Sequence, residues 1–150
     1  MRADWDSYFL SIATLASTRA TCNRAHHGAV IVRDKAIIST GYNGAPRGIE
    51  SCGDRKSCAR ELQNAKPGER YELCISVHAE QNAINLAARN GCSTLGSTLY
   101  VTGLPCLMCA RSIINAGIAA VVFDNSDDRY KDQGTLKLFM QAGVKCKAHI

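Results

Sequence analysis

Two short motifs in the middle of the chain can act together only if the fold brings them side by side. The first is His78-Ala79-Glu80, and the second is a Pro-Cys-x-x-Cys motif at 105–109. One imidazole and two thiolates are ligands of a tetrahedral zinc, and three protein ligands leave the fourth position open, as in catalytic zinc sites. The fold must therefore place His78 next to Cys106 and Cys109.

Glu80 follows His78 too closely to share its face of a helix. We therefore expect it to act as a proton carrier beside the metal and not as a ligand. A lone Cys-x-x-Cys is more often structural or redox-active. A structural site would need four protein ligands, however, and a redox pair would need neither His78 nor Glu80.

The composition is that of an ordinary globular protein, with 46% hydrophobic and 21% charged residues. Its 150 residues predict one domain spanning 1–150. No apolar run is long enough to cross a membrane and no signal peptide is visible, so we expect a cytoplasmic protein without a membrane partner. In that compartment, the eight cysteines point to metal binding and not to disulfides. The net charge of +5 fits a small anionic substrate and nucleic acid equally well.

The periodicity of apolar residues predicts helices alternating with strands after a β-hairpin. The predicted helices are 4–16 with Asp4 as N-cap, 78–90, 105–116 with Pro105 in its first turn, and 135–142. The predicted strands are 29–32, 36–42, 98–102, 119–123 and 144–148. Residues 49–76 form a long loop with a short helix at 57–63. This order predicts an α/β fold, a three-layer α/β/α sandwich around a mixed five-stranded sheet.

Such a fold would bring the two motifs together, because strand–helix units place successive helix N-termini on one edge of the sheet. Both thiolates would then lie in the first turn of a helix, where the helix dipole favours negative charge.

With these motifs and this order of elements, the chain resembles the cytidine-deaminase-like superfamily and, within it, the deoxycytidylate (dCMP) deaminase family. The resemblance covers nearly the whole chain. Its discriminating stretches are Gly-Tyr-Asn-Gly-Ala-Pro-Arg-Gly at 41–48, His-Ala-Glu-Gln-Asn-Ala-Ile at 78–84, Ala-Arg-Asn-Gly at 88–91 and Leu-Tyr-Val-Thr at 99–102. The two metal motifs alone would also fit a tRNA adenosine deaminase or a guanine deaminase, and the glycine-rich stretch favours the dCMP deaminases.

The resemblance implies the hydrolysis of dCMP to dUMP and ammonia. A zinc at His78, Cys106 and Cys109 would lower the pKa of a water to about 7. Glu80 would carry protons to the ring nitrogen and to the departing ammonia. Three further residues are expected to bind the substrate: Asn43 the base and sugar, Ala79 the base carbonyl through its amide, and Arg24 the 5′-phosphate.

Two other kinds of protein stay open. The first is a deaminase that acts on dCTP, or on a base in tRNA or single-stranded DNA. Binding of a polynucleotide would require a stripe of basic residues with stacking aromatic residues. None of the nine aromatic residues interleaves with a Lys/Arg cluster, so we expect no nucleic-acid partner. A zinc-stabilised binding module without activity is the other, and it would not require Glu80.

The resemblance also implies a second, structural zinc in the region of the long loop. Cys22 and Cys52 match its cysteine positions by their spacing from the glycine-rich stretch. The remaining ligands could be Cys58 and Cys74, or His26 and His27. The alternative is that these cysteines are free buried thiols.

Finally, the resemblance implies a homohexamer that is activated by dCTP and inhibited by dTTP, each bound with Mg²⁺. A glycine-rich turn can offer backbone N–H groups to phosphates, although on composition alone the same stretch could be a mere cluster of turns. The expected effector-binding residues are Gly41, Tyr42, Gly44, Ala45, Arg47 and Arg89.

Overall fold

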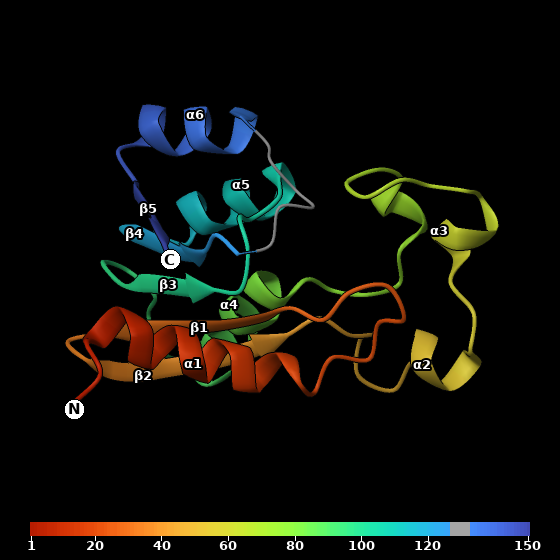
Figure 1. The fold of residues 1–150 in the computed structure, drawn as a ribbon, viewed down its shortest axis with the longest axis horizontal. Coiled ribbons are helices and arrows are strands. Elements are labelled where there is room, and N and C mark those ends of the chain that lie inside the picture. Colours follow the sequence, from red (N-terminus) through yellow and green to blue (C-terminus); the bar gives the residue numbers. More distant parts are fainter. Residues whose placement is uncertain (127–132) are drawn as a thin grey trace.

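The computed structural model describes residues 1–126 and 133–150 and has a five-stranded sheet with helices on both faces (Figure 1). The strands are β1 (Gly28–Arg33), β2 (Ala36–Tyr42), β3 (Thr98–Val101), β4 (Ala120–Asp124) and β5 (Lys145–His149), in the order β2-β1-β3-β4-β5. β1 is antiparallel to both of its neighbours, whereas β3, β4 and β5 are parallel. The predicted mixed sheet is confirmed.

Helix α1 covers one face of the sheet, and the longer helices that follow cover the other. The helices are α1 (Trp5–Ser17), α2 (Cys52–Arg55), α3 (Ala59–Leu62), the 3₁₀ helix η1 (Tyr71–Leu73), α4 (Ala79–Arg89), α5 (Leu107–Asn115) and α6 (Gln133–Ala142). Side chains alternate between the two faces of a strand. Val30 and Tyr100 therefore pack with Phe9 of α1, while Ile31 and Leu99 belong to the core under α4 and α5. These are the three layers of the predicted sandwich.

Two glycines let the helices approach the sheet closely. A Cβ on Gly28 would lie 1.9 Å from the Ala13 carbonyl oxygen in α1. A Cβ on Gly41 would lie 2.2 Å from the Ala79 carbonyl oxygen, in the first turn of α4. Only glycine fits at these two contacts, and the second sets the position of the helix that begins after His78.

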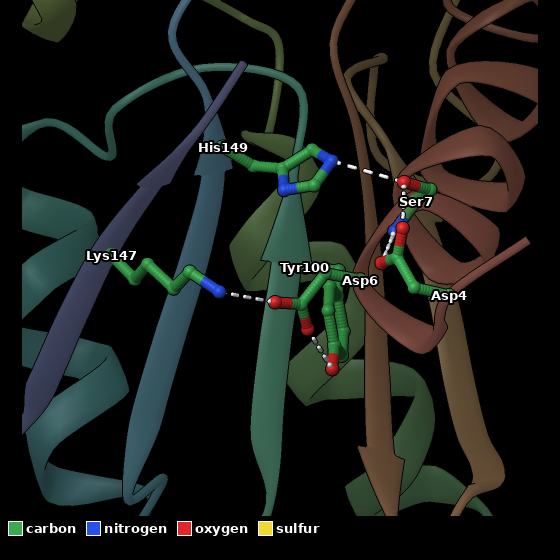
Figure 2. A network of polar contacts seen from close by, with 6 residues as sticks. All are labelled: Asp4, Asp6, Ser7, Tyr100, Lys147 and His149. Carbon is green, nitrogen blue, oxygen red and sulfur yellow. Dashed lines mark hydrogen bonds and ion pairs between the residues drawn. The ribbon is translucent and has the colours of Figure 1, made fainter.

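A polar network joins the N-terminal end of α1 to the opposite edge of the sheet (Figure 2). Asp6 accepts hydrogen bonds from the Tyr100 hydroxyl on β3 at 3.1 Å and from Lys147 Nζ on β5 at 2.7 Å. The Ser7 hydroxyl and His149 Nε2 are 3.1 Å apart. The network thus fastens α1 across β3 and the edge strand β5.

The structure differs from the sequence prediction mainly in the long loop and at one helix end. The predicted short helix at 57–63 is confirmed by α3, whereas α2 and η1 in the same segment were not predicted; each of the three has three or four residues. Pro105 lies just before the N-cap of α5, which is Cys106, and not in the first turn. The other predicted boundaries lie within a few residues of those observed. Within the described residues, no helix is both long and apolar enough to span a membrane.

Candidate metal centre and active site

The starts of α4 and α5 bring the three predicted metal ligands together. His78 is the N-cap of α4, Cys106 is the N-cap of α5, and Cys109 lies in the first turn of α5. The Nδ1 atom of His78 lies 3.5 Å from Cys106 Sγ and 3.4 Å from Cys109 Sγ. Within the described residues this is the only group of three or more such donors whose ligand atoms all lie within 4.8 Å of one another.

These distances fit zinc. Tetrahedral zinc with bonds of about 2.3 Å to sulfur and 2.05 Å to nitrogen requires about 3.6 Å between the two ligand atoms. Both thiols are buried, and the amide N–H of Cys109 donates to Cys106 Sγ at 3.5 Å. The donor set, its spacing and its helix N-terminus all suit a divalent cation held by thiolates.

Ionisation of the site favours the same interpretation. The hydrogen bond to Cys109, and after it the one to His78, lowers the pKa of Cys106 to about 4. The hydrogen bond between the two thiols, together with burial, raises the pKa of Cys109. A cation bound at these sulfurs would favour their thiolate forms further.

Glu80 lies in the first turn of α4 with only 7% of its surface exposed. Burial raises the pKa of this carboxyl above its ordinary value, and the charge of His78 offsets part of that rise. A carboxylate with a raised pKa is suited to taking up and releasing a proton near neutral pH.

A cavity of about 220 Å³ opens at this site. It is lined by His78, Ala79, Glu80 and Cys106, together with the predicted substrate residues Arg24 and Asn43. The structure thus gathers the expected substrate-binding residues around the metal ligands.

Arg24 reaches the cavity wall with part of its guanidinium unpaired. Its Nη2 atom donates to the Ala65 carbonyl at 2.9 Å. Its Nη1 atom is buried without a hydrogen-bond partner. A buried, unpaired guanidinium nitrogen is costly unless an anion can reach it.

Asn43 makes contacts that the sequence did not predict. Its Oδ1 atom accepts from the His27 amide at 2.7 Å, and its Nδ2 atom donates to the Ala25 carbonyl at 2.8 Å. The side chain therefore holds the chain ahead of β1 in place, and each of its polar groups keeps one further hydrogen-bonding position.

The glycine-rich stretch after β2 is largely occupied with the fold. Gly41 packs on α4, and the amides of Asn43 and Gly44 donate to the carbonyls of His27 and Val77. Those two amides are therefore not free for phosphates. Tyr42, Arg47 and Arg89 are exposed. None of the residues expected to bind an effector lines the cavity: Gly41, Tyr42, Gly44, Ala45, Arg47 and Arg89.

The four cysteines expected near a second zinc form a loose group. Burial raises the pKa of Cys52, and the neighbouring Cys58, Cys22 and Cys74 thiols raise it further. No second set of three or more donors in the described part of the chain meets the 4.8 Å distance. Cys58 and Cys74 lie near enough to Cys52 to affect its pKa, and His26 Nε2 lies 3.1 Å from the Cys22 carbonyl oxygen, so the choice of the remaining ligands stays a prediction.

The cavity residues that sequence reasoning missed include Arg60 on α3 and Tyr71 on η1. The only sequence signal was the length of the loop that carries them, since long loops in compact domains are usually functional or disordered.

Fold and site together define a zinc-site protein of the α/β/α class with an open metal position and an adjacent buried carboxylate. Residues 3–125 match the model of the cytidine and deoxycytidylate deaminase zinc-binding region. The chain belongs to this family of zinc-binding deaminases.

Similar proteins include several deoxycytidylate deaminases. The enzyme of Mycobacterium phage D29 is 44% identical over 127 residues, which is 81% of this chain and 95% of the phage protein. The Schizosaccharomyces pombe enzyme is 37% identical over 99% of this chain, which spans 45% of the yeast protein's length. A crystal structure of the dCMP deaminase of cyanophage S-TIM5 with dCMP and dUMP superposes with a TM-score of 0.79 at 27% identity, covering 99% of each chain.

Proposed function

We propose that this chain is a zinc-dependent deaminase that hydrolyses dCMP to dUMP and ammonia. The observation that carries the proposal is the buried Glu80, which lines one cavity together with His78 and Cys106, two members of the His78, Cys106 and Cys109 donor group. Relatives that are named deoxycytidylate deaminases and the S-TIM5 complex with dCMP and dUMP support this choice of substrate.

In this proposal each residue has a defined part. His78, Cys106 and Cys109 hold zinc, which when bound supplies a Lewis acid that activates water at neutral pH. Glu80 accepts one proton from the attacking water and passes it to the ring nitrogen. It then takes the second proton from the newly added hydroxyl group and gives it to the amino group, which leaves as ammonia when the C–N bond breaks. The Ala79 amide, in the first turn of α4, would meet the base carbonyl, and Asn43 would contact the nucleoside.

Arg24 is proposed to bind the 5′-phosphate. Its unpaired Nη1 atom in the cavity wall supports this role, because a phosphate oxygen would satisfy the buried cation. Deoxycytidine, which lacks the phosphate, would leave that atom unpaired, and its kcat/KM should be lower by roughly 10- to 100-fold.

The test measures ammonia release with dCMP, dCTP, deoxycytidine and a cytosine-containing DNA oligomer side by side. The proposal predicts the highest kcat/KM for dCMP. A higher value for dCTP or for the oligomer would assign the chain to one of the alternative substrates. No release from any of the four by zinc-loaded protein would contradict the proposal.

We further propose, on the resemblance to the family, that the enzyme is a homohexamer activated by dCTP and inhibited by dTTP in the presence of Mg²⁺. The exposed side chains of Tyr42, Arg47 and Arg89 are accessible to such effectors. For regulation, the two triphosphates must bind the active and inactive states with different affinities. Saturation curves for dCMP with Mg²⁺ alone, with dCTP and with dTTP test this, and three identical hyperbolas would contradict it.

A further inference from the structure

Arg60 is a buried cation that lacks the usual partner. Only 8% of its surface is exposed, and among the described residues no carboxylate lies within ion-pair distance of it. Its Nε atom donates to the Glu69 carbonyl at 2.8 Å, and its Nη2 atom donates to the Lys66 carbonyl at 3.0 Å. Buried arginines are almost always paired, so this placement needs another explanation.

The guanidinium of Arg60 lies over the ring of Tyr71, with its Cζ atom 4.7 Å from the ring centroid. The ring face therefore takes part of the role that a carboxylate would have. Because the two carbonyls fix the plane of the guanidinium, Arg60 in turn fixes the plane of Tyr71.

Tyr71 then contacts the metal ligand His78. The two ring centroids are 4.8 Å apart and the planes are inclined by 82°, an edge-to-face arrangement. Burial raises the pKa of Tyr71 to about 12, so its side chain is a neutral phenol.

The second ring nitrogen of His78 makes no hydrogen bond within the described residues. Both polar contacts of the ring involve Nδ1, the atom that faces the two thiols. Metal-binding histidines usually donate their other N–H to a carboxylate, a carbonyl or water, and this bond orients the ring. At this site, the contact with Tyr71 is what can fix the ring.

We propose that Tyr71, held by Arg60, is a positioning residue that keeps the His78 imidazole aimed at the metal. The inference rests on the metal site formed by His78, Cys106 and Cys109, and it does not depend on dCMP being the substrate. The ring of Tyr71 matters here and its hydroxyl does not. At position 60 the planar guanidinium matters, because a lysine ammonium cannot stack on the ring in the same way.

The test measures zinc release from the full-length, zinc-loaded protein to a chromophoric chelator. The variants are Tyr71→Leu, Tyr71→Phe and Arg60→Lys, with the exposed Tyr8→Leu as the matched control. Because a second zinc would add a second phase, a Cys106→Ala variant identifies the phase that belongs to this site. Absorption spectra of the cobalt-substituted proteins report the ligand geometry independently of activity.

We expect Tyr71→Leu to release this zinc about 10- to 100-fold faster than the wild type, as when other groups that orient a metal ligand are removed. Tyr71→Phe and Tyr8→Leu should match the wild type, whereas Arg60→Lys should release zinc faster. The cobalt spectrum should change in Tyr71→Leu and Arg60→Lys only.

Wild-type release from Tyr71→Leu would overturn the proposal, as would equally fast release from Tyr71→Phe. If Tyr71→Leu does not fold, the comparison of Tyr71→Phe with Arg60→Lys decides, and release from the lysine variant that is no faster than from the phenylalanine variant overturns the proposal. A raised KM for dCMP in Arg60→Lys with wild-type zinc release would assign Arg60 to substrate binding instead. Since zinc release is measured without substrate, an error in the proposed function would leave these results interpretable.

Discussion

Gly44 and Val77 exchange both of their backbone hydrogen bonds, at 3.1 Å from the Gly44 amide and 2.8 Å from the Val77 amide. This bridge fastens the chain after β2 to the residue that precedes His78. Asn43 and Glu80 are thereby held on adjoining segments at one cavity. The spacing between the expected nucleoside contact and the expected proton carrier is thus set by backbone pairing.

Glu80→Gln should abolish turnover without removing the metal. The amide keeps the size of the side chain but cannot carry a proton, so kcat should fall by about 10²- to 10⁴-fold. The measurements are dUMP formation and zinc content per chain. The exposed Glu50→Gln is the matched control and should behave as the wild type. Activity within tenfold of the wild type in Glu80→Gln would contradict the role of Glu80.

The sheet and the convergence of the three candidate metal ligands could be predicted from the sequence because each depends on local signals. Short continuous runs of apolar residues mark β1, β3 and β4, and the capping residue Asp4 marks the start of α1. The ligands His78 and Cys106 occupy N-cap positions, which follow from a strand–helix alternation.

The long loop could not be predicted in the same way. Helices of one turn have little stability of their own, and here tertiary contacts such as those of Arg60 with two carbonyls hold the segment together. The approach of Gly41 to α4 is likewise a contact between distant segments, and the sequence shows only a glycine. Because Gly41 lies in the glycine-rich stretch, we expected it to bind an effector. In the structure, Gly41 packs against the backbone of α4.

Gly41→Ala should destabilise the protein by about 3 kcal/mol, the upper part of the range for overpacking. The new Cβ would lie 2.2 Å from the Ala79 carbonyl oxygen and 2.5 Å from the Ala83 amide nitrogen, both of them backbone atoms of α4. Urea denaturation measures the free energy of unfolding.

Gly91→Ala is the control for conformational strain alone. Gly91 has a φ of +69° and open space around it, so the alanine variant should lose only about 1–2 kcal/mol. An equal or smaller loss in Gly41→Ala than in Gly91→Ala would show that β2 and α4 can separate at little cost.

The N-cap of α1 should make stability depend on pH in the acid range. The Ser7 amide and then its hydroxyl, both donating to Asp4, lower the pKa of that carboxyl below 3.8. A pKa that is lower in the folded state contributes stability above the unfolded pKa, and this contribution is lost as the pH falls through the folded pKa. The stability difference between the wild type and Asp4→Ala should therefore shrink between pH 7 and about pH 3.

Asp4→Asn separates the charge from the cap, because asparagine still accepts the Ser7 amide. At pH 7, Asp4→Asn should lose less stability relative to the wild type than Asp4→Ala does. Zinc loss in acid affects all three proteins alike, so the differences between their denaturation midpoints are the quantities to compare. A wild-type advantage over Asp4→Ala that stays constant down to pH 3 would contradict the assignment.

The last prediction is a second zinc bound by Cys22, Cys52, Cys58 and Cys74. All eight cysteines are free, and Cys52 and Cys58 are buried beside the other two. Backbone contacts already join the two segments that carry Cys22 and Cys52, since the Gly53 amide donates to the Thr21 carbonyl at 3.0 Å and Asn23 Nδ2 donates to the Cys52 carbonyl at 2.9 Å.

Metal analysis of protein purified without chelator should therefore find two zinc equivalents per chain. Cys52→Ser should lose one equivalent together with thermal stability, because a structural zinc contributes directly to folding. Cys106→Ala should lose the other equivalent, and Cys92→Ser, which removes an exposed thiol, should keep both. If the wild type holds one equivalent and Cys52→Ser retains it, the four cysteines are free thiols that pack the loop, and the stability of that segment comes from its hydrogen bonds alone.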